Sequence, residues 1–366
     1  MLKQTKFVRV FGLGIVTSIS LLLSSCSDSI APEEKKVDAV EEANFAYGNG
    51  VNLQPSYFYQ GNVNVGWALM KTKTQIKSVR IEINPEAPNG GGEAVQVSNA
   101  TRLIKEAHNN GYQVIGTYHP NNLGNESTVQ DIKNAGAFWR RNYNALSNNG
   151  TTPFIINLIN EWGGHNITPA AYAKEVKSAL DNVYAAPVNP RDGGTGRYNK
   201  KVIIDAPGYG QETWTLRQAI NLPEFGSYKD NVVLSAHIYP NAYVERRADG
   251  SKGPMYDNDL AVMGQTGRPC IIGEYGTFSK GGGSAKLEGM VNYAINKNWA
   301  VLAWAWCGDG TGNPESGGSF GGQGMNMVKV PNAAGKNWSY GSFKPFGDNS
   351  AYEASAYMNT MLSKLR

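Results

Sequence analysis

Residues 154–161 read Phe-Ile-Ile-Asn-Leu-Ile-Asn-Glu, and residues 270–274 read Cys-Ile-Ile-Gly-Glu. Each is a short isoleucine-rich run bounded by turn residues, a pattern that predicts a buried parallel strand and is too short for a helix. Each run closes on a carboxylate, Glu161 in the first and Glu274 in the second. A charge at the rim of a core is costly unless something uses it. The two runs therefore predict a pair of strand-end carboxylates with a chemical role.

The rest of the chain repeats the same alternation of short β-branched runs and amphipathic segments. The predicted strands are Gly50–Leu53, Ser78–Asn84, Gln113–His119, Phe154–Glu161, Val202–Gly208, Val232–Tyr239, Pro269–Gly276 and Ala300–Trp306. The predicted helices include Val95–Asn109, Thr128–Leu146, Pro169–Val183, Lys286–Asn296 and a closing helix, Ala351–Leu365. Eight strand–helix units are the count of a single (β/α)8 TIM barrel, an α/β fold. A doubly wound sheet is the competing architecture, but no glycine-rich fingerprint follows the first strand.

The N-terminus has the pattern of an export signal. Lys3, Lys6 and Arg9 precede the largely apolar run 10–23, and Leu-Ser-Ser-Cys26 follows. This resembles a bacterial lipoprotein signal, with an ordinary secretory signal or a membrane helix as the alternatives. The resemblance implies cleavage after residue 25, lipid on Cys26 and a polar tether over 26–45. We therefore expect an exported protein anchored in the bacterial envelope, in the outer membrane or at the cell surface, with its catalytic domain over 46–366.

The net charge and the cysteines give no support for a nucleic-acid-binding protein or for a disulfide-stabilised one. Loss of residues 1–25 removes three positive charges, so the formal net charge falls from +4 to +1 and gives no reason to expect nucleic-acid binding. Cys270 opens one predicted strand and Cys307 follows the end of another, too far apart for a disulfide. We expect two thiols outside any disulfide and a monomeric protein.

All strands of a barrel end on one face, so the polar and aromatic residues at their carboxyl ends converge. These residues are Arg80, His119, Asn160, Glu161, His237, Tyr239, Glu274 and Trp306. Taken singly, each has a structural reading as an ion-pair partner, a helix cap or rim packing. Two carboxylates at one barrel mouth are the arrangement that hydrolyses glycosidic bonds.

Together these residues resemble glycoside hydrolase family 5, from about residue 46 to the C-terminus. The motifs are Ile-Asn-Glu-Trp closing the fourth strand, Ala-His-Ile-Tyr closing the sixth, Gly-Glu-Tyr-Gly closing the seventh and Trp-Ala-Trp closing the eighth. The resemblance implies a retaining glycosidase with Glu161 as general acid/base and Glu274 as nucleophile. In such enzymes the two carboxyl groups lie about 5–5.5 Å apart.

The resemblance also assigns roles to the neighbouring residues. Arg80 and Tyr239 would hold Glu274 ionised, while Glu161 would stay protonated at working pH. Asn160 would donate to the 2-hydroxyl of the sugar. The remaining substrate-binding candidates are two histidines that complete the polar wall and two indoles that offer a ring face: His119, His237, Trp306 and Trp162.

The expected substrate is a β-1,4-linked plant polysaccharide cut internally. The segments 205–211 and 302–310 look most like bacterial β-mannanases of the family, with cellulase or xylanase activity as alternatives and a non-catalytic glycan-binding protein as the alternative from another class. We expect no cofactor and no metal, because no closely spaced His/Cys/Asp cluster occurs. The loop Asp309-Gly-Thr-Gly-Asn313 could hold calcium, although such glycine-rich loops are usually turns.

Overall fold

The structure is a computed structural model, and it describes residues 47–88, 90–189, 196–277, 285–309, 325–331, 338–339 and 343–365. The export signal, Cys26 and the tether lie outside these residues, as do residues 310–324 of the loop that includes the alternative calcium site. Within the described ranges, no helix has both the length and the apolar character needed to cross a membrane.

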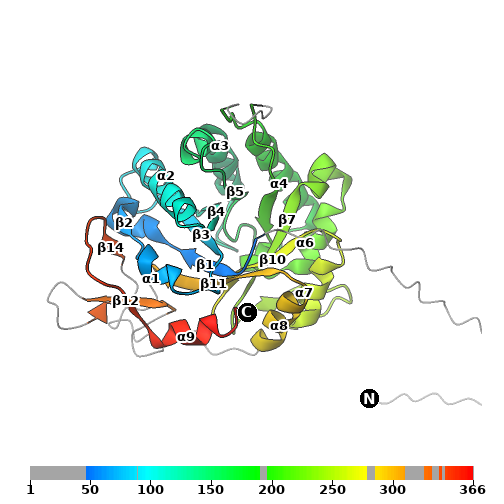
Figure 1. Ribbon diagram of the computed structural model, residues 1–366. Helices are drawn as coiled ribbons and strands as arrows, with labels where there is room; N and C mark the ends of the chain where they lie inside the picture. Colours follow the sequence, from blue (N-terminus) through cyan, green and yellow to red (C-terminus); the bar gives the residue numbers. More distant parts are fainter. Residues whose placement is uncertain are drawn as a thin grey trace, which may run out of the picture. The chain divides into compact units, whose positions relative to one another are not determined.

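Eight parallel strands close into a barrel, which confirms the predicted (β/α)8 fold (Figure 1). Around the ring the order is β1-β11-β10-β7-β6-β5-β4-β3, so that the last barrel strand in the chain pairs with the first. The strands are β1 (Gly50–Leu53), β3 (Ser78–Ile83), β4 (Gln113–Tyr118), β5 (Ile155–Asn157), β6 (Val202–Asp205), β7 (Val232–Ile238), β10 (Cys270–Tyr275) and β11 (Ala300–Cys307). Each overlaps one of the eight predicted strands.

Helices surround this ring (Figure 1). They are α1 (Trp67–Lys71), α2 (Glu93–Asn109), α3 (Val129–Leu146), α4 (Pro169–Tyr184), α5 (Pro207–Gly210), α6 (Thr213–Ile220), α7 (Asp257–Gly264), α8 (Leu287–Asn296) and α9 (Ala356–Leu362). The 3-10 segments are η1 (Pro55–Tyr57), η2 (Tyr59–Gly61) and η4 (Pro223–Asp230). Thr128 precedes α3 and forms a capping box with Asp131. The Thr128 hydroxyl accepts from the backbone N–H of Asp131, and the Asp131 carboxylate accepts from the backbone N–H of Thr128.

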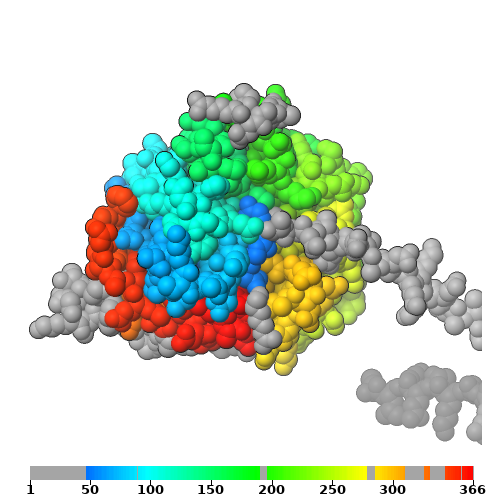
Figure 2. Space-filling view, in the orientation of Figure 1, coloured from blue at the N-terminus to red at the C-terminus, as the bar shows by residue number. Residues whose placement is uncertain are grey.

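Short strands decorate the barrel, namely β2 (Val63–Asn64), β8 (Tyr243–Val244), β9 (Gly253–Pro254), β12 (Val328–Pro331), β13 (Trp338–Ser339), β14 (Lys344–Pro345) and β15 (Glu353–Ala354). Strand β14 pairs antiparallel with β2, which joins the C-terminal segment to the first unit. In Figure 2 the C-terminal residues (red) cover the surface between the first unit (blue) and α8 (yellow). The predicted last helix was five residues too long at its start, because β15 occupies part of that range.

The core has two parts. The larger lies between strands and helices, as expected for an amphipathic helix on a barrel. The smaller fills the barrel itself and consists of Ile115, Ile155, Ile203, Val233, Ile271, Ala300 and Leu302. Cys270 begins β10 and Cys307 ends β11; both are buried and no disulfide joins them, as predicted.

Candidate active site

Above the apolar plug, the barrel interior becomes polar toward the carboxyl ends of the strands. Arg80 of β3 lies at the centre of this layer and is completely buried. A guanidinium has five N–H donors, and all five are assigned. Nε donates to Asn157 (2.8 Å), one terminal nitrogen to Asn52 and Glu274 (both 2.9 Å), and the other to Asn160 (2.5 Å) and Thr117 (3.4 Å). One side chain thus ties together residues of β1, β4, β5 and β10.

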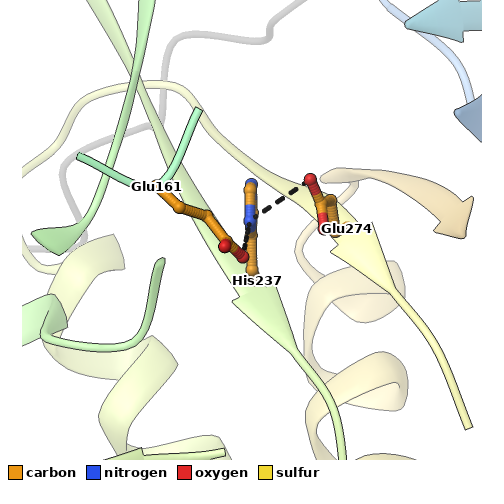
Figure 3. Close-up of side chains that lie close together, drawn as sticks. All are labelled: Glu161, His237 and Glu274. Atoms are coloured by element: carbon orange, nitrogen blue, oxygen red, sulfur yellow. Dashed lines mark hydrogen bonds and ion pairs between the residues drawn. The ribbon is translucent and has the colours of Figure 1, made fainter. Parts of the chain in front are cut away.

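The two predicted carboxylates meet at the mouth of the barrel, with His237 between them (Figure 3). One oxygen of Glu161, one oxygen of Glu274 and a ring nitrogen of His237 all lie within 4.8 Å of one another. His237 Nδ1 is 2.9 Å from Glu161 Oε1 and 3.5 Å from Glu274 Oε1. The expectation that the two strands deliver their acids to one place is confirmed.

The charges in this layer determine the state of His237. Burial would lower its pKa, but the carboxylates of Glu274 and Asp205 outweigh burial and raise the pKa of His237 to about 10. Burial would raise the pKa of Asp205, but His237 and Arg80 lower it to about 2. His237 therefore carries a proton at neutral pH. The three side chains of Figure 3 also have metal-ligating atoms, and His237 would have to lose its proton before it could ligate an ion.

Glu274 accepts hydrogen bonds on both oxygens. Arg80 donates to Oε1, and the hydroxyl of Tyr239 donates to Oε2 at 2.6 Å. Both contacts were predicted. The electrostatic result differs from the prediction, because burial, followed by repulsion from Glu161, raises the pKa of Glu274 even though His237, Arg80 and Tyr239 act in the opposite direction.

Glu161 lies on a loop, because β5 ends at Asn157 rather than at the glutamate. Its backbone has φ +49°, a left-handed conformation that is uncommon for a residue with a side chain. Two hydrogen bonds hold it there: its N–H donates to Asp205 (3.3 Å), and its carbonyl accepts from Gly124 N–H (2.8 Å). Strained backbone of this kind persists only where the surroundings determine it.

His119, which follows β4, lies beside a further buried acid, Glu82. His119 Nε2 lies 3.7 Å from Glu82 Oε2, and its Nδ1 lies 3.3 Å from the hydroxyl of Tyr57. Burial, reinforced by the charge of Arg80, lowers the pKa of His119 to about 3, so its ring is neutral at neutral pH. His119 therefore lies among two polar side chains that were not predicted as site residues, Glu82 and Tyr57.

The two tryptophans expected to offer a ring face to the sugar pack inside the protein. Trp306 is fully buried, and its indole donates to the Val65 carbonyl (2.8 Å). Trp304, two residues earlier on β11, is 8 % exposed. Trp162 also packs inside the protein. It is 4 % exposed and donates to the Thr128 carbonyl (2.7 Å).

Four site residues were missed: Glu82, Asp205, Asn52 and Asn157. Each is buried on a barrel strand. Strand periodicity was the available signal, because a residue two positions from an inward-facing residue also faces inward. Glu82 is two residues beyond Arg80, and Asn157 is two residues beyond Ile155 of the plug.

Comparisons with known proteins agree with this geometry. The family model described as cellulase (glycosyl hydrolase family 5) matches residues 46–310. No curated protein matches the chain.

Several solved structures share the fold. A β-mannanase from Streptomyces thermolilacinus, crystallised with mannohexaose, is 21 % identical with a TM-score of 0.52, covering 72 % of this chain and 80 % of its own. A family 5 cellulase from an Icelandic hot spring isolate is 14 % identical with a TM-score of 0.59, covering 87 % and 88 %. The catalytic domain of an endoglucanase from Thermobifida fusca is 15 % identical with a TM-score of 0.56, covering 87 % and 91 %.

Proposed function

The chain belongs to glycosyl hydrolase family 5, and from that premise we propose that it cleaves β-1,4-linked polysaccharide internally by a retaining mechanism, with mannan as its preferred polymer. The observation that carries the proposal is the proximity of Glu161 and Glu274: one carboxylate oxygen of Glu161 lies within 4.8 Å of one carboxylate oxygen of Glu274. A separation of about 5–5.5 Å is typical of retaining enzymes, whereas inverting enzymes need about 6.5–9.5 Å to admit a water.

In the first step, the Glu274 carboxylate attacks the anomeric carbon and forms an ester bond. The glycosidic C–O bond breaks, and Glu161 gives its proton to the departing oxygen. In the second step, water attacks the same carbon from the opposite direction. Glu161 takes a proton from that water, the ester bond breaks, and Glu274 is a carboxylate again.

The neighbouring residues orient the two glutamates. Arg80 and Tyr239 fix both oxygens of Glu274, so that the attacking lone pair has one direction. His237 contacts Glu161 at 2.9 Å and fixes the acid. Arg80 also donates to the side-chain oxygen Oδ1 of Asn160, so the side-chain nitrogen Nδ2 is the atom that can donate to the 2-hydroxyl of the sugar.

The preference for mannan rests on the likeness of segments 205–211 and 302–310 to bacterial β-mannanases and on the mannanases among the structural relatives. Cellulases among the same relatives keep β-glucan as the alternative polymer. Incubation of the purified protein with mannan, carboxymethylcellulose and xylan, followed by assay of reducing ends, tests the proposal. We expect release from mannan above the other two. Binding without release on all three would contradict catalysis and favour a glycan-binding protein.

Two variants test the roles of the glutamates. Glu274→Ala should abolish turnover on natural polymers while glycan binding persists, because the nucleophile acts after binding. Glu161→Ala should lose far more activity on natural polymers than on aryl glycosides with good leaving groups, since only the former need a proton. Near-normal rates for the first variant, or equal losses on both substrates for the second, would overturn the assignments.

We also propose that the mature protein is anchored to the outer membrane by lipid on Cys26, because the sequence before it resembles a lipoprotein signal. Metabolic labelling of cells with a clickable fatty acid should label the protein. The Cys26→Ala variant should remain unlabelled and leave the membrane fraction. Equal labelling of both chains would refute the anchor.

A further inference from the structure

Glu82 is a third acid beside the two glutamates, and the mechanism above does not use it. Its side chain is fully buried. Among the described residues, neither of its oxygens has a hydrogen-bond partner. Oε1 lies 3.6 Å from Arg80, and Oε2 lies 3.7 Å from Nε2 of His119.

The hydrogen bonds of Arg80 decide the charge of Glu82. Because all five N–H groups of Arg80 already have acceptors, none remains for this carboxyl. A buried carboxylate without donors is strongly disfavoured, so the group keeps its proton. Burial accordingly raises the pKa of Glu82 well above its usual value, although Arg80 opposes the shift.

The charges from the other strands act in both directions on Glu82. Glu274 on β10 and Glu161 beyond β5 repel a negative charge there, while His237 on β7 attracts one. The positive charges of Arg80 and His237 face the carboxylates of Asp205 and Glu274. An ionised Glu82 would add an unbalanced charge to the buried cluster.

A protonated Glu82 has one O–H donor, and the nearby Nε2 of His119 is an acceptor in only one tautomer of the neutral ring. In that tautomer the proton of His119 is on Nδ1, which faces the oxygen of Tyr57 at 3.3 Å. The separation of 3.7 Å between Glu82 Oε2 and His119 Nε2 is longer than a hydrogen bond, so the two atoms must move closer for the carboxyl to donate.

Tyr57 would then accept two hydrogen bonds. Nδ1–H of His119 donates to its oxygen, and so does the amide of Asn84 at 2.9 Å. Both lone pairs of the hydroxyl are thereby used, and its own proton is left for another acceptor. Burial raises the pKa of Tyr57 to about 12, so this proton is retained at neutral pH. Tyr57 is 38 % exposed and can reach a ligand.

We propose that Glu82 is a positioning residue whose protonated carboxyl fixes the Nδ1–H tautomer of His119, and that this makes the Tyr57 hydroxyl an obligatory donor to an oxygen of the bound glycan. Tyr57 is the residue that touches substrate, and Glu82 acts on it through His119. The proposal rests on the proposed function for the identity of the ligand, a neutral sugar chain rich in acceptor oxygens. The tautomer itself does not depend on that function.

The first test measures the tautomer directly. The chain has only four histidines, so ¹⁵N-histidine labelling and long-range ¹H–¹⁵N correlation NMR can resolve each ring, with His119→Asn providing the assignment. We expect Nδ1–H for His119 in the full chain and in Glu82→Gln, whose amide can also donate to Nε2. Glu82→Met, which has no donor, should lose this preference. An Nε2–H ring in the unsubstituted protein would overturn the proposal whether or not the protein cleaves any glycan.

The second test measures binding in kinetics on mannan, or on the polymer that the protein cleaves best. Tyr57→Phe should raise KM by about five- to tenfold with little change in kcat, the effect of losing one hydrogen bond between neutral groups. Glu82→Met should raise KM similarly, and the double variant should raise it no further, because both changes remove the same interaction. Glu82→Gln should behave as the unsubstituted protein.

Tyr59→Phe is the matched control, since Tyr59 is an exposed tyrosine two residues away and should not affect KM. Additive effects of Tyr57→Phe and Glu82→Met, or a Gln variant as impaired as the Met variant, would refute the proposal. If Glu82→Met does not fold, the isosteric Gln variant and Tyr57→Phe still decide it through the NMR and KM measurements.

Discussion

Replacement of Arg80 by lysine keeps its positive charge but removes part of its hydrogen bonding. Lysine has three donors where arginine has five, so at least two of the five acceptors around Arg80 lose their partner. A hydrogen bond to a charged group contributes about 1.5–3 kcal/mol, so we expect Arg80→Lys to lower the free energy of unfolding by about 3–6 kcal/mol. Domains typically have about 5–15 kcal/mol in total, so the loss would be a large fraction.

Urea unfolding followed by tryptophan fluorescence measures this loss, with the slope checked for constancy between variants. Arg141→Lys is the matched control. Arg141 makes three hydrogen bonds, all to the carboxylate of Glu93, and its side chain is 55 % exposed. Exposed ion pairs contribute only about 0–1 kcal/mol to the free energy of unfolding. If Arg80→Lys costs no more than Arg141→Lys, the view that one buried guanidinium organises the polar layer is wrong.

Three further changes test other parts of the structure. Trp306→Ala should lower the free energy of unfolding by about 3–5 kcal/mol without altering the KM of the folded enzyme, whereas Trp304→Ala should raise KM; the reverse pattern would restore Trp306 to the cleft. Because its pKa is raised to about 10, His237 contributes stability that is fully present below about pH 6.5 and lost as pH rises through 10, and a His237→Gln variant should flatten that alkaline decline in the urea midpoint. Gly124→Ala would place a Cβ 2.2 Å from the ring of Tyr209 at a φ of +50°, so the melting temperature should fall, and an added Tyr209→Ala should recover only part of the fall because the backbone strain remains.

The fold could be predicted from the sequence because every barrel strand is a short β-branched run. Such runs are buried on both faces and stand out against amphipathic helices. The limits of elements were less accurate. The isoleucines of 154–159 suggested one long strand, yet β5 has three residues, because the backbone leaves the ladder to bring Glu161 to the mouth.

The candidate site was predicted where residues stand at strand ends and missed where they stand within strands. Glu161, Glu274 and Tyr239 close their runs, and their contacts follow the prediction. Glu82 lies inside the run Val-Arg-Ile-Glu-Ile, and only its spacing of two positions from Arg80 indicates that it shares the inward face. The sequence does not show that Arg80 donates hydrogen bonds to five acceptors. The charge state of the residues around Arg80 could therefore not be inferred from the sequence.

The two catalytic candidates are attached to the barrel in different ways. Glu274 belongs to β10, whose backbone is paired on both sides, by β7 and β11. Glu161 depends on a loop held by contacts with Gly124 and Asp205. Local openings begin in loops before strands. Gentle heating should therefore disable proton donation by Glu161 before it disables attack by Glu274. A warmed enzyme should lose activity first on natural polymers, while it still cleaves aryl glycosides whose leaving group needs no proton.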